Sequence, residues 1–325
     1  MIAAVADVLL VTAEQAGETL AAVVREAAPG TSWSRARELC RSGRVWLDGE
    51  PATDPARRLA GGERIELRLD APALRREAVP LDAVLHLDAD VAVVRKPAGL
   101  LTVPFAGGER SERETLLSLA RVAVRRLDTI RGQEPNPSLR AVQRLDKDTS
   151  GLVVFARNVR AQRRLQEQLG EHSVTRRYLA VVHGAAADAV CDSLLVPDRG
   201  DGLRGSWGFL RSAPGEPPPE ARNAITFVTV LERLAEATLV ACELETGRQH
   251  QIRIHLAEAG HPVVGETVYI RDWRGPLLAA PRLMLHAAVL GFVHPRTGRP
   301  VRWEDPPPAD FAAVLARLRP SRVQP

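Results

Sequence analysis

Hydrophobic residues between positions 82 and 319 follow two patterns that predict two kinds of element. Short, uninterrupted apolar runs are typical of strands buried on both faces, and they occur at 91–94, 152–155, 179–182 and 239–242. Longer stretches with apolar residues three or four positions apart predict amphipathic helices at 116–127, 160–169 and 249–259. The two kinds do not alternate regularly, and no glycine-rich loop follows a strand. The pattern therefore predicts an α+β fold whose mixed, mostly antiparallel sheet is flanked by helices.

The first 70 residues have the pattern of a separate small domain. Helical stretches at 19–27 and 34–42 are followed by strand-like runs at 44–47, 50–52 and 63–69. Asp48-Gly49 and Gly61-Gly62 separate these runs and favour tight turns. We therefore predict a small α/β domain at 1–70, a linker at 71–81, a large domain at 82–319 and a frayed tail at 320–325.

Composition and charge narrow the class of protein. The chain is 45% hydrophobic and 26% charged, which is the balance of a soluble globular protein. Its net charge of +4 and pI of about 9.4 suit a nucleic-acid partner only where the cations gather on one face. The three cysteines form no C-x-x-C pair, and no segment has the features of a membrane span or a secretory signal. We expect a cytoplasmic protein without a membrane partner.

Arginines cluster on the second predicted helix of the small domain. Arg35, Arg37, Arg41 and Arg44 place four cations within ten residues. They could form an ordinary solvated helix face, or bind RNA phosphates through charge and bidentate hydrogen bonds. The pattern S-R-A-R-E-L-C-R-S-G-R-V-W-L-D-G-E, closed by G-G-E-R-I-E-L, resembles a small RNA-binding domain shared by a small-subunit ribosomal protein and several tRNA-acting enzymes. That resemblance implies a helical face that binds structured RNA.

The segment most informative about chemistry is A-V-Q-R-L-D-K-D-T-S-G-L-V-V-F-A-R-N, at 141–158. Asp146 lies between Arg144 and Lys147 in a loop that precedes an apolar strand. A loop that presents a carboxylate at the edge of a sheet suits a nucleophile or a general base. Nearby positive charge favours the ionised form of that carboxylate. The residues alone leave open an ordinary polar turn, closed by local hydrogen bonds of Asp and Ser.

Five segments, in order, resemble the motifs of the RluA-type pseudouridine synthases. R-L-D-x-x-T-S-G around Asp146 looks like the family's signature, and D-V-A-V-V-R-K-P-A-G-L, with Lys96, looks like its first motif. The others are T-R-R-Y-L-A-V-V-H-G with Tyr178, E-T-G-R-Q-H-Q-I-R-I-H with Arg248 and Arg253, extended by G-H-P-V-V-G-E-T-V-Y, and M-L-H-A with Leu285. Both lysines and both tyrosines of the chain fall inside these motifs.

The resemblance implies a role for each matched residue. Asp146 would attack the target uridine at its anomeric carbon or ribose, so that the glycosidic bond breaks and uracil rejoins the ribose through carbon 5. Tyr178 would stack on the base and help to take the carbon-5 proton, and Arg253 would pair with Asp146. Arg144 would fill the gap left by the flipped nucleotide, and Leu285 would pack against the flipped base. The further RNA contacts that we predict are Lys96, Arg248, Arg35, Arg37 and Arg41.

The implied partner is structured RNA. Ribosomal RNA is favoured over tRNA, because an N-terminal RNA-binding module commonly accompanies the family's large-subunit ribosomal RNA enzymes. The isomerisation is not a redox reaction, so we expect no cofactor and no metal. We also expect the protein to act as a monomer. His250, His255 and His261 are spaced by five and six residues, which does not match the spacing of an H-E-x-x-H metal pair.

The chain departs from the family's pattern at three positions, and two other functions stay open. Gln143 stands where the family usually has His, Glu266 where Asp is more usual, and Ile270 where Gly is common. One alternative is a catalytically silent RNA-binding protein on the same scaffold. The other is a hydrolase that uses the Asp146 loop on a small molecule.

Overall fold

The computed structural model of the chain describes residues 7–28, 30–69, 78–104, 115–210 and 215–319, apart from the side chains of Asp7, Ser34 and Arg41. It divides into two compact units, residues 1–77 and 78–325, and each has its own apolar core. Most of the predicted linker at 71–81 and all of the predicted tail at 320–325 lie outside the described residues.

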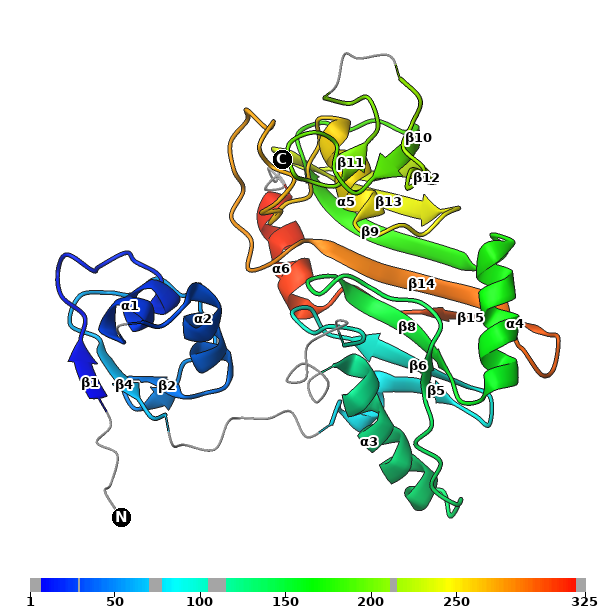
Figure 1. Ribbon diagram of the computed structural model, residues 1–325, viewed down its shortest axis with the longest axis horizontal. Helices are drawn as coiled ribbons and strands as arrows, with labels where there is room; N and C mark the ends of the chain where they lie inside the picture. The colour runs from blue at the N-terminus through cyan, green and yellow to red at the C-terminus, as the bar shows by residue number, and fades with distance from the viewer. Residues whose placement is uncertain (1–6, 29, 70–77, 105–114, 211–214, 320–325) are drawn as a thin grey trace, which may run out of the picture. The chain divides into compact units, whose positions relative to one another are not determined.

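The first unit is a four-stranded antiparallel sheet packed against two helices (Figure 1). Its helices are α1 (Leu20–Ala27) and α2 (Trp33–Arg41), and its strands are β1 (Asp7–Leu10), β2 (Val45–Leu47), β3 (Glu50–Pro51) and β4 (Arg64–Leu67), in the order β1-β4-β2-β3. The hydroxyl groups of Thr19 and Ser32 cap the two helices by accepting hydrogen bonds from backbone amides of the first turn. The predicted small α/β fold is confirmed, and β1 is a strand that the pattern did not indicate.

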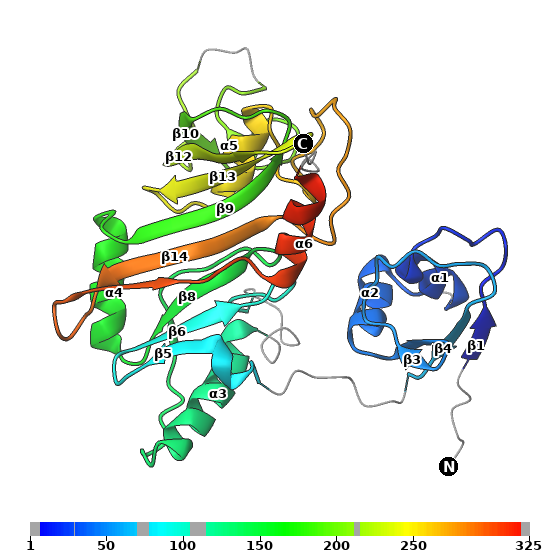
Figure 2. The ribbon, with the colours of Figure 1, turned by 180° about the vertical axis from the view of Figure 1, so that it is seen from behind.

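One mixed sheet of 11 strands forms the centre of the second unit (Figure 2). Its strands are β5 (Val84–Leu87), β6 (Val91–Lys96), β7 (Arg140–Ala141), β8 (Ser150–Ala156), β9 (Thr175–His183), β10 (Ala189–Val196), β11 (Gly205–Ser206), β12 (Arg222–Arg233), β13 (Ala237–Leu244), β14 (Leu285–Val293) and β15 (Pro300–Glu304). They follow the order β11-β10-β12-β13-β9-β14-β8-β6-β5, with β15 beside β14 and β7 beside β8. Among the described strands, only β14 and β8 pair in parallel. The predicted mixed, mostly antiparallel sheet is confirmed.

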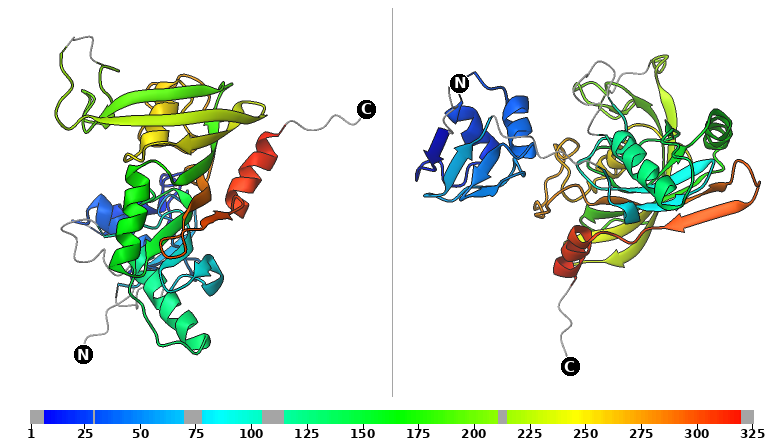
Figure 3. Two further views of the ribbon diagram at one scale, coloured as in Figure 1. Left: turned by 90° about the vertical axis from the view of Figure 1, so that its right-hand side faces the viewer. Right: turned by 90° about the horizontal axis from the view of Figure 1, so that it is seen from below.

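Helices cover both faces of this sheet. They are α3 (Leu116–Ile130), α4 (Val159–Gly170), α5 (Gln251–Glu258) and α6 (Ala309–Leu318), with a short 3-10 helix, η1 (Leu81–Ala83), before β5. Val153 and Phe155 of β8 belong to the core that includes α3 and α6, whereas Leu152 and Val154 belong to the core that includes α4. Figure 3 shows α4 and α6 on opposite sides of the sheet. No helix in the described part of the chain is both long enough and apolar enough to span a lipid bilayer.

Some elements differ from the predicted ones. The helix predicted at 249–259 begins only at Gln251, because His250 has a left-handed backbone with a φ of 60°. The short strand β11 and the buried Arg199 lie in the segment 198–210, for which the sequence pattern predicted no element. Strands β10, β12 and β15 were not assigned from the sequence because they are partly exposed and interrupt their apolar residues with polar ones.

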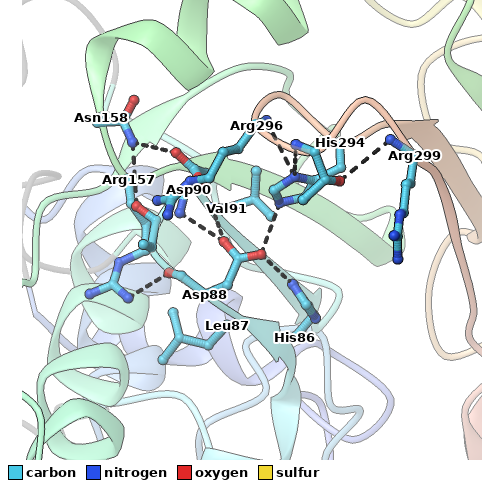
Figure 4. A network of polar contacts seen from close by, with 12 residues as sticks. His86, Leu87, Asp88, Asp90, Val91, Arg157, Asn158, His294, Arg296 and Arg299 are labelled. Carbon is cyan, nitrogen blue, oxygen red and sulfur yellow. Dashed lines mark hydrogen bonds and ion pairs between the residues drawn. The ribbon is translucent and has the colours of Figure 1, made fainter.

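A cluster of polar side chains ties the turn between β5 and β6 to the end of β14 (Figure 4). The Asp88 Oδ2 atom accepts hydrogen bonds from His86 Nε2 and His294 Nε2, both at 2.9 Å. Its Oδ1 atom accepts hydrogen bonds from the backbone N–H groups of Asp90 and Val91 at 2.7 and 2.8 Å. Burial alone would raise the pKa of Asp88, but these hydrogen bonds outweigh it and lower the pKa to about 2.

Candidate active site

A cleft of about 800 Å³ opens in the second unit, next to the first residues of β8 and β14. Its walls come from four stretches of chain, at 101–104, 141–149, 169–178 and 244–253, together with Leu285. The lining includes six of the predicted site residues, Arg144, Asp146, Tyr178, Arg248, Arg253 and Leu285. A volume of this size suits a small-molecule-sized group such as an extruded nucleotide.

Hydrogen bonds from neighbouring segments hold the loop that carries Asp146. The Thr102 hydroxyl donates to the carbonyl oxygen of Leu145 at 2.8 Å and accepts from the Leu145 N–H at 3.1 Å. On the other side of Asp146, Lys96 Nζ donates to the carbonyl oxygen of Lys147 at 2.8 Å. The backbone is thus held on both sides of the carboxylate, which lies in a fixed position in the cleft.

The prediction that Lys96 contacts RNA is wrong. Its side chain is 0% exposed, and its ammonium group donates to the carbonyl oxygens of Pro97 and Lys147. A buried ammonium group needs such acceptors, because its desolvation is costly. Lys96 positions the Asp146 loop instead.

Glycine is required where β8 meets β14. Gly151 has a φ of 114°, and a Cβ atom there would lie 2.3 Å from the carbonyl oxygen of Ala287. Ser150 and His286, opposite each other in the same pairing, share a hydrogen bond of 3.0 Å. This close parallel approach brings the Asp146 loop next to Leu285 at the start of β14. It explains the glycine of the T-S-G motif and supports a structural role for His286.

Arg253 connects Asp146 to a buried glutamate. Its Nη1 atom lies 3.7 Å from Asp146 Oδ2, while its Nε and Nη2 atoms donate to the two carboxylate oxygens of Glu266 at 2.7 and 2.8 Å. Burial works against the charge of both partners, yet their bidentate pairing raises the pKa of Arg253 and lowers that of Glu266. The guanidinium therefore stays charged and keeps one side turned toward Asp146.

A histidine approaches the other oxygen of Asp146. His250 Nε2 lies 4.0 Å from Asp146 Oδ1, and its Nδ1 forms a 2.8 Å hydrogen bond with the Tyr269 hydroxyl. Burial lowers the pKa of His250 although the charge of Asp146 opposes that shift. Burial also raises the pKa of Tyr269 to about 12. Both groups are neutral near pH 7, whereas Arg253, 3.7 Å away, carries a positive charge beside the carboxylate.

Tyr178 and Leu285 form an apolar wall of the cleft. Tyr178 lies in β9 opposite Ala287 of β14, and the two side chains of the wall are 8% and 3% exposed. Burial raises the pKa of Tyr178 to about 12, a shift that Arg176 opposes and Asp146 reinforces. The phenol is therefore protonated near neutral pH, and its ring can contact a flat ligand in the cleft.

The remaining predicted contacts with described side chains are Arg144 and Arg248 in the second unit and Arg35 and Arg37 in the first. Arg144 and Arg248 are exposed residues of the cleft, and Arg248 Nε donates to the carbonyl oxygen of Asn223 at 2.9 Å. In the first unit, Arg35 pairs with Glu38 at 2.9 Å, and Arg37 lies 5.5 Å from the Trp33 ring. The side chain of Arg41 lies outside the described residues.

Sequence reasoning assigned no role to four residues of this site, His250, Glu266, Tyr269 and Arg176. Arg176 precedes Tyr178 by two positions, and the two-residue period of a strand places both on one face. That signal was available in T-R-R-Y. The partnership of Glu266 with Arg253 was not, because residues 13 apart in a loop and a helix show no periodicity that could pair them.

Three side chains outside the cleft, Asp88, Asp90 and His294, are close enough together to share a cation. The hydrogen bonds of His294 disfavour a bound cation at this position. His294 Nδ1 accepts from the backbone N–H groups of Arg296 and Thr297, so the ring proton is on Nε2, the nitrogen that faces Asp88. A metal on Nε2 would move that proton to Nδ1, against two N–H donors. We call this hydrogen-bonded cluster, in which Asp88 links His86 to His294, the Asp88 clamp.

The three histidines considered as metal ligands have separate partners. His250 is bonded to Tyr269, His255 to Thr226 and Ser193, and His261 to the carbonyl oxygen of His183. Burial lowers the pKa of His255 to about 4. These contacts account for the three side chains without a shared ion.

Two family models match the chain. Residues 90–258 match the family described as RNA pseudouridylate synthase, and residues 18–65 match the S4 domain. The first match contains Asp146, Tyr178 and Arg253, and the second contains helices α1 and α2.

Similar proteins carry related names. "Ribosomal large subunit pseudouridine synthase D" of Xanthomonas campestris pv. campestris is 36% identical over 326 residues, which cover 94% of this chain and 90% of the relative. "Uncharacterized RNA pseudouridine synthase YlyB" of Bacillus subtilis is 36% identical over 297 residues, which cover 88% and 90%. Among solved structures, human RNA pseudouridylate synthase domain containing 4 shares the fold, with a TM-score of 0.58 and 23% identity over 73% of this chain and 93% of that one.

The matched family model spans more than half of the chain, and relatives of similar length align with nearly all of it. The motif resemblance, the fold and these matches lead to the same assignment. The chain belongs to the family of RNA pseudouridylate synthases, isomerases that convert uridine in RNA to pseudouridine.

Proposed function

We propose that this enzyme isomerises uridines of large-subunit ribosomal RNA, with Asp146 as the nucleophile. The observation that carries the assignment of Asp146 is its ion pair with Arg253, 3.7 Å away, in a cleft that Tyr178 and Leu285 also line. A nucleophilic carboxylate benefits from a neighbouring positive charge that holds it in the orientation needed for attack. Arg253 supplies that charge, and Glu266 holds Arg253 in place.

In the proposed reaction, the target nucleotide leaves the RNA helix and enters the cleft, at a cost of a few kcal/mol. Asp146 attacks at the ribose, the glycosidic bond breaks, and the detached uracil turns in the cleft. Carbon 5 then bonds to the ribose as the bond to Asp146 breaks. The proton on carbon 5 passes to solvent, and N1 of the uracil takes up a proton from solvent, so the product is an isomer of the substrate. Tyr178 and Leu285 hold the base during its rotation by stacking and packing, and Arg144 fills the position that the nucleotide leaves.

The structure suggests a narrower role for Tyr178 than the sequence did. With a pKa near 12 its phenol is protonated at neutral pH, and a protonated phenol is a poor acceptor for the carbon-5 proton. We therefore assign to Tyr178 the surface on which the base stacks, and not the acceptance of the proton.

The choice of RNA rests on the relatives and on the first unit. Several relatives are named as synthases of the large ribosomal subunit, and the S4 match covers the helix that carries Arg35 and Arg37. Ribosomal RNA as the substrate would place the enzyme in the cytoplasm.

Tritium release tests the proposal. Large-subunit ribosomal RNA and tRNA, both lacking pseudouridine and labelled at carbon 5 of uridine, are each incubated with the enzyme. Release from ribosomal RNA alone is the expected result, and mapping pseudouridine in cells with and without the protein would then identify the position. Release from tRNA alone would reassign the substrate. No release from any cellular RNA would favour a silent RNA-binding protein, and turnover of a small molecule without salt dependence would favour the hydrolase.

A further inference from the structure

A buried arginine without an acidic partner lies beside the proposed base-stacking residue. Arg176 is 8% exposed, lies two positions before Tyr178 in β9, and lines the same cleft. Among the described residues, no carboxylate forms an ion pair with it, and its buried Nε atom has no hydrogen-bond acceptor. Buried charges in proteins are normally paired or fully hydrogen-bonded. The absence of both is a reason to expect an anionic ligand here.

The electrostatic surroundings of Arg176 point the same way. Burial lowers the pKa of its guanidinium, and the nearby positive charge of Arg248 lowers it further. Arg248 is itself an exposed residue of the cleft. Two like charges near each other on a partly desolvated wall repel, and an anion between or beside them removes that repulsion.

The chain is shaped to hold this guanidinium in one place. Arg176 Nη2 donates to the carbonyl oxygens of Leu244 and Glu245, at 3.3 and 2.8 Å. A Cβ atom at Gly247 would lie 2.4 Å from Arg176 Nη1, so glycine in E-T-G-R leaves the room that the side chain needs. In the described part of the structure Nη1 donates to no acceptor, so its two N–H groups can bind a ligand.

We propose that Arg176, supported by Arg248, binds a phosphate of the RNA backbone next to the uridine that stacks on Tyr178. This inference rests on the proposed function, since it requires an RNA in the cleft. Arginine is suited to the task because its guanidinium stays charged and its planar N–H groups match the oxygens of a phosphate. Arg176 is thus a substrate-positioning residue, and we assign it no chemical step.

The test compares Arg176→Met, which keeps the length of the side chain and removes its charge, with Arg177→Met. Arg177 is the adjacent residue of β9, points to the other face, and pairs with Glu243 at 3.7 Å. On large-subunit ribosomal RNA we expect Arg176→Met to raise KM about 10- to 100-fold, with a small effect on kcat. The dependence of log Kd on log salt concentration should weaken by about one unit. Arg176→Lys should recover most of the salt dependence but only part of the affinity.

A second measurement locates the phosphate. A hairpin containing the mapped target uridine is prepared with one neutral methylphosphonate linkage, placed either 5′ or 3′ of that uridine. At one of these positions the wild-type protein should lose about as much affinity as Arg176→Met does on the unmodified hairpin, and the variant should lose little more. Equal losses for both proteins at both positions, or an equal effect of Arg177→Met, would overturn the assignment.

Binding and turnover separate this inference from the proposed function. All affinities, including those of the protein with a wild-type Arg176, are measured in chains that also carry Asp146→Asn. They therefore do not depend on catalysis. If the enzyme releases tritium but Arg176→Met binds RNA as the wild type does, the phosphate assignment alone fails. If no RNA is turned over, the proposed function fails first. Where Arg176→Met does not fold, Arg176→Lys and the methylphosphonate hairpins on the wild type still decide the matter.

Discussion

The guanidinium of Arg253 gives two of its hydrogen bonds to Glu266 and faces Asp146 only with its remaining Nη1 atom. Glu266 in turn accepts from the backbone N–H groups of Thr267 and Val268 at 2.9 and 2.8 Å. The carboxylate that orients Arg253 is thus more firmly held than the one proposed to react. This division suits a nucleophile, which must keep an oxygen available for the substrate.

Glu266→Gln should therefore slow turnover although residue 266 lies behind Arg253. The neutral amide can accept only one of the two hydrogen bonds, and a small displacement of Arg253 should lower kcat about 10²-fold, with little change in KM. Removing one partner of a buried pair should also destabilise the protein by about 3–5 kcal/mol. Glu266→Asp keeps the charge and should recover part of kcat. Unchanged kcat in folded Glu266→Gln would show that this glutamate does not orient the site.

Asp146→Asn should abolish turnover and leave RNA binding intact. The amide is not a nucleophile, so kcat should fall at least about 10³-fold, while loss of a negative charge cannot weaken attraction to RNA phosphates. Asp148→Asn, an equal change of charge in the same loop, is the matched control. Single-turnover assays and equilibrium binding measure the two effects. Substantial residual activity in Asp146→Asn would remove this residue from the mechanism.

The double substitution Arg35→Ala with Arg37→Ala should weaken RNA binding and leave kcat at saturating RNA unchanged, because both residues lie in the first unit. For every cation that no longer binds a phosphate, the slope of log Kd against log salt should fall by about 0.7–0.9. Arg57→Ala with Arg64→Ala removes the same charge from the same unit, from side chains that are 49% and 56% exposed. Equal effects of the two pairs would mean that helix α2 has no special role.

Gly151→Ala should destabilise the second unit severely. The new Cβ atom would collide with the backbone of β14, at a φ that disfavours any side chain, so we expect a loss of about 3 kcal/mol or more. Gly170→Ala at the end of α4, where a Cβ atom meets nothing within 4 Å, should be neutral or stabilise by up to about 1 kcal/mol. Urea unfolding compares the two, and a mild effect at position 151 would contradict the close approach of β8 and β14.

The Asp88 clamp should make stability depend on acid pH. The pKa of this carboxyl falls from an ordinary 3.8 to about 2 on folding, so its contribution is complete above pH 4 and is lost as the pH falls toward 2. Its side chain is 33% exposed, and solvent screening reduces the expected contribution to about 1–2 kcal/mol. The free energy of unfolding of Asp88→Asn should be lower than that of the wild type at pH 6. An equal difference between the two proteins at pH 6 and pH 2.5 would count against the clamp.

The linear order of residues was sufficient to predict the class of fold and to propose the residues at the centre of the site. Buried strands such as β6 and β8 contain uninterrupted apolar runs, which identify them in the sequence. Asp146, Tyr178 and Arg253 could be named because each lies in a local motif. Half-exposed strands could not be identified from the sequence. In β12, for example, the alternation of polar and apolar residues is interrupted by a bulge near Val230.

Sequence by itself was sufficient to propose which residues belong to the chemistry, since motifs are local and contain those residue types. Only the tertiary structure decided how those residues act on one another. Lys96 changed from a predicted RNA contact to a buried support of the loop, Glu266 became the partner of Arg253, and Arg176 was left without a counter-charge among the described residues of the cleft. Burial and charge pairing depend on segments far apart in the chain, so no local pattern contains them.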